Sequence, residues 1–434
     1  MMKKLSAIVL TAILAASMTA CQSGDVQSGS SASSQTQSTA SSEKTESNTA
    51  SETSAKTVSN GAVNADELFT SRDTEQSADL SDAVTHTLSD GKDISITAAG
   101  VYVIKGSAED VTVTVDADGQ DKVQIVLDGA TITNTDAPAI YVKSADKVFV
   151  TTTNSQNTLS VTGSFTADGE TNTDAVIFSK DDLVLNGEGT LNISSTQNGV
   201  TSKDDVKITG GTYSITSTAD GIEANDAVAI SGGSITVKSD KDGVHAENSD
   251  DDSKGSFYMG GGSLTVTAAD DGIHAVTVAQ FDGGECTVSA AEGIEATYIQ
   301  INDGKITIEA ADDGINAANK SSAYSVKAEF NGGETTITMG QGDTDAVDSN
   351  GDLIINDGTI TINAQSPFDY DGTVEKNGGT IIVNGEETDE ITNQFGGMGG
   401  MGGGPGGMGG GPGGMRDRGG MGGQAPMQDN GMSF

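Results

Sequence analysis

The stretch "DGIEANDAVAISGGSITVKSDKDGVHA", residues 220–246, contains the phrase that decides the fold. It opens with an acidic residue, a glycine and an aliphatic residue, and the same order returns at residues 242–244. Between these two points, apolar and polar residues alternate in the short runs "AVAI" and "SITV", which is typical of β-strands that bury one face. A pair of glycines separates the two runs, as expected at a corner of the chain. This stretch therefore predicts short strands joined at glycine corners.

The residue that opens the phrase recurs along most of the chain. Its occurrences are Asp174, Asn198, Asp220, Asp242, Asp271, Glu292, Asp313 and Asp345. Their spacing clusters near 22 residues, and the two longest steps contain the insertions "NSDDDSKGS" and "ANKSSAYS". A short fixed period indicates a solenoid whose turns stack on one another.

Aliphatic residues also recur at one position of each turn, as expected for a continuous core. They are Val200, Ile222, Val244, Ile273, Ile294, Ile315 and Val347. The sequence predicts an all-β fold, a right-handed single-stranded parallel β-helix with about 22 residues per turn over residues 79–395. Leucine-rich repeats need a leucine and asparagine spacing that this chain lacks, and propeller blades need longer units. Cys286 falls in an aliphatic position, so we expect a buried, inert thiol.

The two ends of the chain predict disordered termini and a membrane anchor. Residues 1–20 combine lysines with a short apolar run that stops at Cys21, and this resembles a bacterial lipoprotein signal peptide. We therefore expect a lipid on Cys21 and an extracytoplasmic protein attached to the bacterial cell surface through that lipid alone. Residues 21–78 are rich in Ser and Thr and predict a flexible tether. The Gly- and Met-rich tail, residues 396–434, predicts disorder.

The formal net charge of the chain is −41, and it contains no tryptophan. Phosphate binding needs lysine and arginine, so nucleic acid is not expected as a partner. The sequence has only two cysteines, Cys21 and Cys286, which provide no disulfide framework. Something other than disulfides must therefore hold the domain together.

Acidic side chains form aligned columns in the predicted solenoid. Equivalent residues of stacked turns lie about 4.8 Å apart, so the opening residues form one column. Three positions later a second column contains Glu223, His245, His274, Glu295, Asn316 and Asp348. The glycine between the columns is expected to turn a corner and bring both to one edge. At this spacing, neighbouring carboxylates repel by about 3–4 kcal/mol per pair at an effective dielectric constant near 20.

Screening by water and salt, raised pKa values or bound cations can each relieve this repulsion. Clustered carboxylate and amide oxygens suit Ca²⁺, which accepts six to eight oxygens in flexible geometry, better than Mg²⁺, which demands an octahedron. We predict several calcium ions. The predicted ligands are Asp220, Glu223, Asp240, Asp242, Asp270, Asp271, Glu292, Glu295, Asp312, Asp313, Asn316, Asp343, Asp345 and Asp348. For His245 and His274 we expect pairing with nearby carboxylates, with a zinc site as the alternative.

Longer phrases resemble one bacterial family. They are "GVYVIKGS" (100–107), "DVTVTVDA" (110–117), "VQIVLDGATIT" (123–133) and "APAIYVKSADKVFV" (137–150), together with the turns "DGIxA" and "ITGGTYSITS". These phrases are similar to those of the bacterial carbohydrate-binding domain family. The resemblance implies a secreted or lipid-anchored parallel β-helix that contains calcium and binds plant-type polysaccharides, including acidic pectic polymers and cellulose.

Taken together, these features predict a surface-anchored, non-catalytic, calcium-dependent carbohydrate-binding protein. Calcium would bridge protein carboxylates to an acidic polysaccharide such as polygalacturonate. Tyr258 and Tyr298 are expected to point outward, but they form no aromatic row for neutral sugars. A pectate-lyase-like enzyme is one alternative, with Lys241 as the best-placed base because every arginine lies outside the predicted solenoid. A calcium-stabilised surface scaffold or adhesin is the other.

Overall fold

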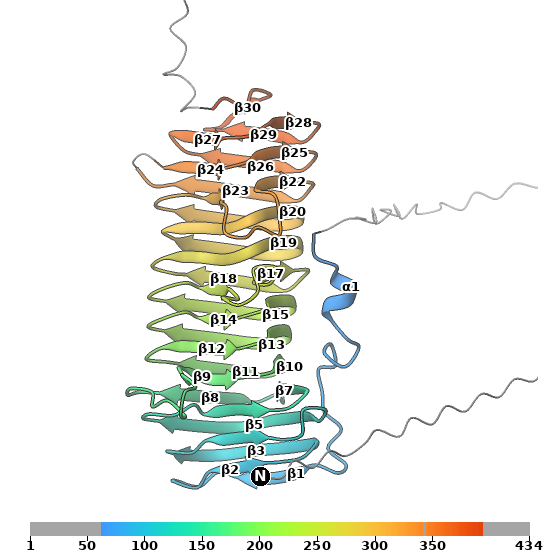
Figure 1. The fold of residues 1–434 in the computed structure, drawn as a ribbon, viewed down its shortest axis with the longest axis vertical. Coiled ribbons are helices and arrows are strands. Elements are labelled where there is room, and N and C mark those ends of the chain that lie inside the picture. The colour runs from blue at the N-terminus through green and yellow to red at the C-terminus, as the bar shows by residue number, and fades with distance from the viewer. Residues whose placement is uncertain (1–61, 342–343, 394–434) are drawn as a thin grey trace, which may run out of the picture. The chain divides into compact units, whose positions relative to one another are not determined.

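Successive turns of parallel strands make up the protein (Figure 1). The computed structural model describes residues 62–341 and 344–393, so the predicted signal peptide, Cys21 and the glycine-rich tail lie outside the described residues. Within those ranges the chain has one α-helix, α1 (Ala65–Leu68), and 30 strands that belong to one hydrogen-bonded sheet. The all-β prediction is confirmed. No helix in the described ranges is both long and apolar enough to cross a membrane.

The strands stack in three series, which we call the first, second and third faces. The first face contains β1 (Val84–Thr87), β3 (Gly100–Glu109), β5 (Lys122–Asn134), β7 (Lys147–Thr152), β10 (Asp182–Gly187), β13 (Asp205–Ser217), β15 (Ala227–Ser239), β17 (Ser256–Met259), β19 (Asp271–Ala290), β20 (Glu292–Ala310), β22 (Lys327–Phe330), β25 (Asp352–Ile355) and β28 (Val374–Lys376). The long strands β3, β5, β13, β15, β19 and β20 turn a corner and continue onto the second face. That face also contains β8 (Gln156–Val161), β11 (Thr190–Ser194), β18 (Ser263–Thr267), β23 (Glu334–Met339), β26 (Thr359–Asn363) and β29 (Thr380–Val383).

The third face positions the candidate site. It contains β2 (Ile94–Ile96), β4 (Val113–Asp116), β6 (Ile140–Ser144), β9 (Ala175–Ser179), β12 (Asn198–Ser202), β14 (Ile222–Ala224), β16 (Val244–Ala246), β21 (Ile315–Ala317), β24 (Asp345–Ser349) and β27 (Ser366–Tyr370), and the first residues of β19 and β20. Every pairing among these strands is parallel. The short strand β30 (Glu386–Thr388) pairs antiparallel with β29 beyond the last turns.

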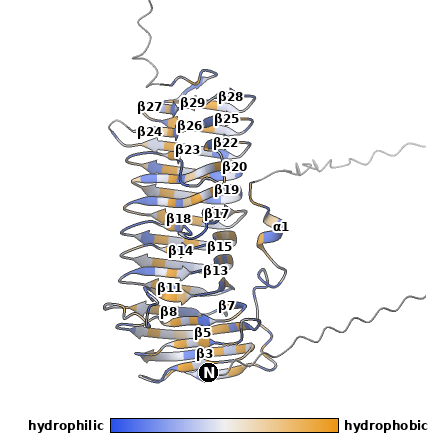
Figure 2. Cartoon of the chain, in the orientation of Figure 1, coloured by the Kyte–Doolittle hydropathy of each residue, from blue (hydrophilic) through white to orange (hydrophobic). Residues whose placement is uncertain are grey.

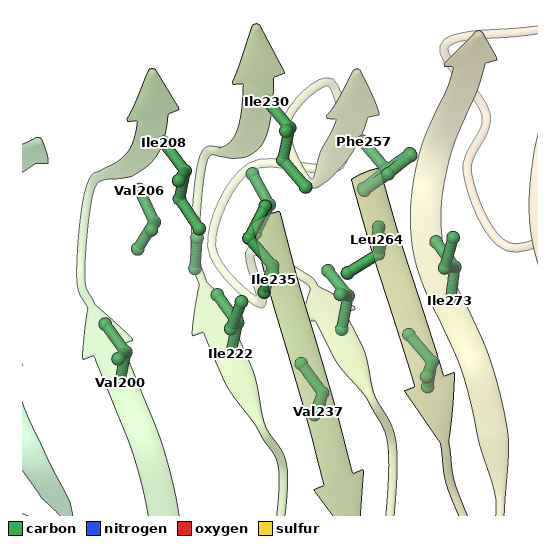
Figure 3. Close-up of a cluster of buried hydrophobic side chains, with 14 of the residues drawn as sticks. Val200, Val206, Ile208, Ile222, Ile230, Ile235, Val237, Phe257, Leu264 and Ile273 are labelled. Carbon is green, nitrogen blue, oxygen red and sulfur yellow. The ribbon is translucent and has the colours of Figure 1, made fainter. Parts of the chain in front are cut away.

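The core runs through the middle of the turns. All seven aliphatic residues of the predicted column are fully buried, and they meet residues of the other two faces (Figure 3). Hydrophobic and hydrophilic residues alternate along most strands, so each strand sends one set of side chains to this core (Figure 2). Cys286 is buried in it as predicted, and burial raises the pKa of its thiol to about 12.

Close packing explains why glycine follows the opening residue of each phrase. A Cβ atom on Gly243 would lie 2.2 Å from Cγ1 of Val266 and 2.6 Å from the carbonyl oxygen of Gly272. A Cβ atom on Gly272 would lie 2.1 Å from Cγ1 of Val288. Real Cβ contacts are never this short, so only glycine fits where the chain enters the third face. The crowded interior therefore explains the glycine of each phrase.

Residues 62–78 run against the turns, although they fall within the predicted flexible tether. The carboxylate of Asp73 is fully buried, and each of its oxygens lies 3.2 Å from Nζ of Lys147. The guanidinium of Arg72 lies 4.5 Å from the ring centroid of Phe149, and Nε2 of Gln76 donates to the carbonyl oxygen of Thr209. The ordered part therefore begins before residue 79. Its contacts join residues far apart in sequence, which no local pattern predicts.

Candidate functional site

A row of polar side chains, which we call the ladder, follows the edge where the chain enters the third face. Its inner column contains Asn198, Asp220, Asp242, Asp271, Glu292, Asp313 and Asp345, and Asp174 lies at its near end, one residue before Ala175, which pairs with Asn198. Its outer column contains Thr201, Glu223, His245, His274, Glu295, Asn316, Asp348 and Asp369, which lie opposite one another on successive strands. The structure thus brings both predicted columns to one edge.

Backbone hydrogen bonds hold the inner column in place. Oδ1 of Asp220 accepts the N–H of Asp242, and Oδ1 of Asp242 accepts the N–H of Asp271, both at 3.1 Å. Oδ1 of Asp313 accepts the N–H of Asp345 in the same way. Each of these carboxylates therefore uses one oxygen to tie two turns together. The other oxygen of Asp220 contacts Lys241, and that of Asp242 contacts His245.

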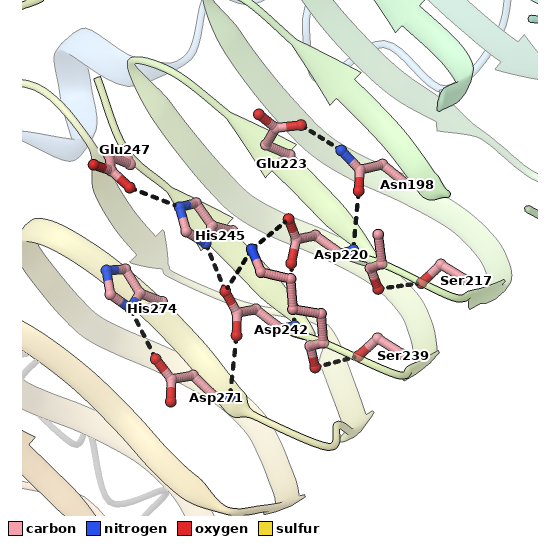
Figure 4. Close-up of polar contacts among 12 residues, drawn as sticks. Asn198, Ser217, Asp220, Glu223, Ser239, Asp242, His245, Glu247, Asp271 and His274 are labelled. Carbon is pink, nitrogen blue, oxygen red and sulfur yellow. Dashed lines mark hydrogen bonds and ion pairs between the residues drawn. The ribbon is translucent and has the colours of Figure 1, made fainter. Parts of the chain in front are cut away.

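The middle of the ladder, which we call the histidine section, contains Asp220, Lys241, Asp242, His245, Asp271, His274 and Glu295. Figure 4 shows Asp220, Asp242, His245, Asp271 and His274 of this section. Nδ1 of His245 lies 2.6 Å from Oδ2 of Asp242, and Nδ1 of His274 lies 2.8 Å from Oδ2 of Asp271. The two imidazole rings stack with centroids 4.8 Å apart and an angle of 3° between their planes. This section therefore pairs each acidic side chain with a basic one.

Further basic groups surround the histidine section. Nζ of Lys241 lies 3.2 Å from Oδ2 of Asp220 and 3.7 Å from Oδ2 of Asp242. Nδ1 of His274 lies 2.9 Å from Oε2 of Glu295, and Nζ of Lys320 lies 2.7 Å from Oε1 of the same residue. The expected pairing of the two histidines with carboxylates is confirmed.

These contacts explain the pKa directions in the histidine section. Burial alone would lower the pKa of His274, but its contacts with Asp271 and Glu295 outweigh burial and raise that pKa to about 10. Burial would raise the pKa of Asp242, but the hydrogen bond from His245 lowers it. The pKa of Asp220 is raised, first by burial and then by the charge of Asp242. Most charges in this section are therefore compensated within the protein.

The far end of the ladder, which we call the acidic section, contains Glu292, Asp313, Asn316, Asp345, Asp348 and Asp369. Burial and then the charges of nearby aspartates raise the pKa of Asp348 to about 7. Burial, opposed in part by a hydrogen bond from Asn316, raises the pKa of Glu292 to about 7. Burial also raises the pKa of Asp313 to about 6.

Two buried oxygens of the ladder have no hydrogen-bond partner. They are Oδ1 of Asn316 and Oδ1 of Asp174, and no other buried side-chain nitrogen or oxygen among the described residues is in this state. Nδ2 of Asn316 donates to Oε2 of Glu292 at 3.0 Å, so its oxygen is fixed while it lacks a donor. A buried polar atom without a partner costs stability, so such atoms call for an explanation.

The remaining predicted ligands join the ladder to different degrees. Glu223 lies in the outer column, where it accepts hydrogen bonds from Asn198 and Thr201. Asp240, Asp270 and Asp312 precede the inner column and are exposed. One oxygen of Asp270 still lies within 4.8 Å of oxygens of Asp242 and Asp271. Asp343 lies outside the described residues.

The structure also reveals acidic residues that the sequence analysis missed. Asp369 extends the outer column because it lies opposite Asp348, but its stretch "SPFDY" lacks the aspartate–glycine phrase. A separate cluster joins Asp182, Asp204 and Asp205, where burial raises the pKa of Asp204 to about 7. The repeated "SKDD" at residues 179–182 and 202–205 was the signal for this cluster.

Other side chains bear on what the site can do. Tyr258 and Tyr298 leave the core as predicted, but both are buried because Phe69 and Tyr324 lie over them. No aromatic side chain in residues 62–341 and 344–393 is exposed. For Lys241, burial alone would lower the pKa, but Asp220 and Asp242 raise it, which opposes a role as a base at neutral pH.

These features define an all-β protein of stacked turns with an acidic edge. The family model described as carbohydrate-binding domain-containing protein matches residues 90–344 and 292–394. The chain belongs to this family. A curated relative of the same description from Acetivibrio thermocellus is 33% identical over 159 residues, which cover 35% of this chain and 53% of the relative. The match thus spans about half the length of that relative.

A solved structure gives a partial match. It is described as a polysaccharide lyase-like protein from C. thermocellum in a gadolinium derivative. Its TM-score is 0.47 at 28% sequence identity, over 52% of this chain and 96% of the other.

Proposed function

We propose that this protein binds acidic polysaccharide through calcium ions held by the carboxylates of the ladder. We also propose that its stacked turns form a right-handed single-stranded parallel β-helix, since each strand pairs in parallel with a strand one turn away. Membership of the carbohydrate-binding domain family supports a polysaccharide partner. The calcium and the acidity of the ligand are inferences from the ladder.

The unpartnered oxygen of Asn316 carries the calcium proposal. Asn316 offers a buried oxygen that no donor satisfies, close to the carboxylates of Glu292 and Asp348. Burial first, and then the negative charges of neighbouring carboxylates, raise the pKa values of both carboxylates to about 7. Oxygen donors of this type, charged and neutral together, suit calcium. We assign Asp313, Asp345 and Asp369 as the remaining calcium ligands of the acidic section.

The other predicted ligands hold different partners. Asp220, Asp242, Asp271 and Glu295 contact Lys241, His245, His274 or Lys320, so calcium there would have to displace a cationic side chain. Their role as ligands remains a prediction. The acidic section is therefore the first place to test.

The absence of exposed aromatic residues in the described ranges supports an acidic ligand over crystalline cellulose, because neutral sugar chains usually stack on aromatic faces. The formal charge of −41 would repel polygalacturonate unless a cation lies between protein and polymer. Bound calcium supplies positive charge and open coordination positions for uronate oxygens. The protein supplies fixed carboxylates at regular spacing along one edge.

Affinity electrophoresis tests this function. Wild-type protein should be retarded in gels that contain polygalacturonate and calcium, and excess chelator should abolish the retardation. Asp313→Asn and Asp348→Asn should weaken it, whereas Glu334→Gln, at an exposed position on the second face, should not. Retardation that survives the chelator would overturn the calcium bridge.

The same gels separate the alternatives. A chelator-sensitive melting temperature without retardation on any of a panel of polysaccharides would favour a structural scaffold. Appearance of unsaturated uronate products, followed by ultraviolet absorbance, would favour a lyase.

We further propose that residues 1–20 are a lipoprotein signal peptide and that lipid on Cys21 anchors the protein to the outside of the bacterial cell membrane. The lysines, the apolar run and the cysteine that follows it support this location. Cys21→Ser should release the protein from the membrane fraction. A variant that stays in the membrane fraction would contradict the anchor.

A further inference from the structure

The stacked histidines of the third face form a site distinct from the acidic section. His245 and His274 lie opposite each other on β16 and β19, with nearly parallel rings. Glu247, which follows β16, places Oε2 3.1 Å from Nε2 of His245. One possible ligand atom from each of these three residues lies within 4.8 Å of the other two. Three donors that include two imidazoles therefore converge on one point of the surface.

The hydrogen bonds behind the rings fix which nitrogen faces outward. Nδ1 of His245 contacts the carboxylate of Asp242, and Nδ1 of His274 contacts that of Asp271. An ionised carboxylate can only accept, so both Nδ1 atoms carry hydrogen. Both Nε2 atoms point away from these aspartates, on the side where Glu247 lies (Figure 4). In the neutral rings these Nε2 atoms carry the lone pairs.

This arrangement is the usual support of a histidine that binds a metal. Such a histidine donates its other ring N–H to a carboxylate, which fixes the tautomer and increases the basicity of the ligand nitrogen. Here two histidines on adjacent strands have that support at once. The side chains of His245 and His274 are 15% and 14% exposed, so an ion can reach the outer edges of the rings.

We propose that His245, His274 and Glu247 bind a divalent transition-metal ion of the zinc type, with water in the remaining position. The two imidazole nitrogens select such an ion over calcium or magnesium, which prefer oxygen ligands. In the metal-free protein the rings are nearly parallel, and their Nε2 lone pairs run side by side. To share one tetrahedral zinc ion with bonds near 2.0–2.1 Å, the Nε2 atoms must lie roughly 3.4 Å apart, so binding requires at least one imidazole ring to rotate toward the other. Glu247 is about half exposed and is free to follow the ion.

The charges around the pair favour this ion. Asp242, Asp271 and Glu295 lie behind the rings, and Glu247 lies in front of them. Without metal, a proton on Nε2 of His245 can hydrogen-bond to Glu247. A divalent ion would replace that proton, and because it has twice the charge, the surrounding carboxylates would attract it more strongly.

Zinc titration of the full-length chain, in millimolar calcium and with a chromogenic competitor, tests the site. His245→Gln and His274→Gln should each remove one bound zinc equivalent, with an affinity loss greater than about 100-fold because a ligand matters more than its outer-shell support. Glu247→Gln replaces the third ligand and should weaken binding by at least the roughly 10-fold to 100-fold that a change in outer-shell support costs. The matched control is His86→Gln, since His86 is the only other histidine and lies against Tyr102. It should bind zinc as the wild type does.

The outcomes separate this site from calcium binding and from misfolding. Asp348→Asn, in the acidic section, should leave the zinc equivalent intact. Unfolding midpoints in chelator establish that each variant is folded, and the exposed Glu247 offers a change that disturbs no buried group. The proposal is wrong if His245→Gln and His274→Gln bind zinc as tightly as the wild type, or if the wild type binds no more zinc than they do.

Discussion

The histidine section and the acidic section occupy the same edge of the same fold, yet they manage negative charge in opposite ways. In the first, Lys241, His245, His274 and Lys320 meet the carboxylates directly. In the second, Asp348 has mainly other aspartates around it, and its pKa is raised to about 7. The same edge therefore carries one section in which basic side chains of the protein contact the carboxylates and one in which burial and neighbouring carboxylates raise the pKa values.

This difference shows what the architecture fixes and what it leaves free. The inner column is set by backbone hydrogen bonds, such as that from the N–H of Asp271 to Oδ1 of Asp242. The outer column changes identity from turn to turn, from Glu223 to His245 to Asn316, without any change of register. A ladder of this kind can thus acquire different chemistry in each turn.

The largest effect should come from breaking the frame that both sections share. Gly272→Ala would place a Cβ atom 2.1 Å from Cγ1 of Val288, between Asp271 and His274. Overpacking of this kind should lower the free energy of unfolding by about 3 kcal/mol or more. Chemical denaturation in chelator measures the loss.

The matched control for that substitution is Gly119→Ala. Nothing lies within 4 Å of a Cβ atom at Gly119. The free energy of unfolding of this variant should therefore differ from that of the wild type by less than about 0.5 kcal/mol. Equal losses in both variants would show that alanine itself, and not the crowded corner, is responsible.

The second comparison replaces one carboxylate in each section by its amide. Asp242→Asn removes the charge that holds His245 and should destabilise the protein by about 2 kcal/mol, because a charge-assisted hydrogen bond is lost. Asp348→Asn relieves repulsion from neighbouring aspartates and should stabilise the metal-free protein by about 1 kcal/mol at neutral pH. Opposite signs in chelator-treated samples are the expected result. The same sign in both would mean that the two sections do not differ as described.

The sequence predicted much of the frame because its signals are periodic. Alternation and the aspartate–glycine phrase predicted the buried column from Val200 to Val347 and the shared edge of Asp242 and His245. The sequence could not predict which carboxylates contact a basic side chain. Lys320 reaches Glu295 from an insertion, and Asp73 reaches Lys147 from a distant segment, so neither contact follows from a repeat.

A third comparison uses pH in divalent-free buffer. The folded pKa of His274, about 10, lies above its ordinary value of 6.5, so its contribution is complete below pH 6.5 and is lost as pH rises toward 10. The pKa values of Asp348 and Glu292 are also raised, to about 7, so the acidic section loses stability as pH rises from about 4 to 7. The histidine contribution should be on the order of 2 kcal/mol, discounted because water reaches the ring edge.

Variants assign the two pH windows to the two sections. His274→Gln should flatten the fall of the melting temperature between pH 7.5 and 10 and leave the acidic window unchanged. Asp348→Asn should do the reverse. If His274→Gln leaves the alkaline fall untouched, the charge on His274 does not stabilise the fold.

The smallest effect concerns Lys241, which is half exposed but contacts Asp220 and Asp242. Lys241→Gln should lower the free energy of unfolding by less than about 1 kcal/mol in low salt, and by even less in high salt, because exposed ion pairs are weak and screened.

The same variant also tests where the ladder accepts calcium. Removing this cation makes the histidine section more like the acidic section, so added calcium should raise the melting temperature of Lys241→Gln more than that of the wild type. The control is Lys305→Gln, whose partner Glu285 lies on the second face. Equal responses of both variants to calcium would mean that internal cations do not decide where the ladder accepts calcium.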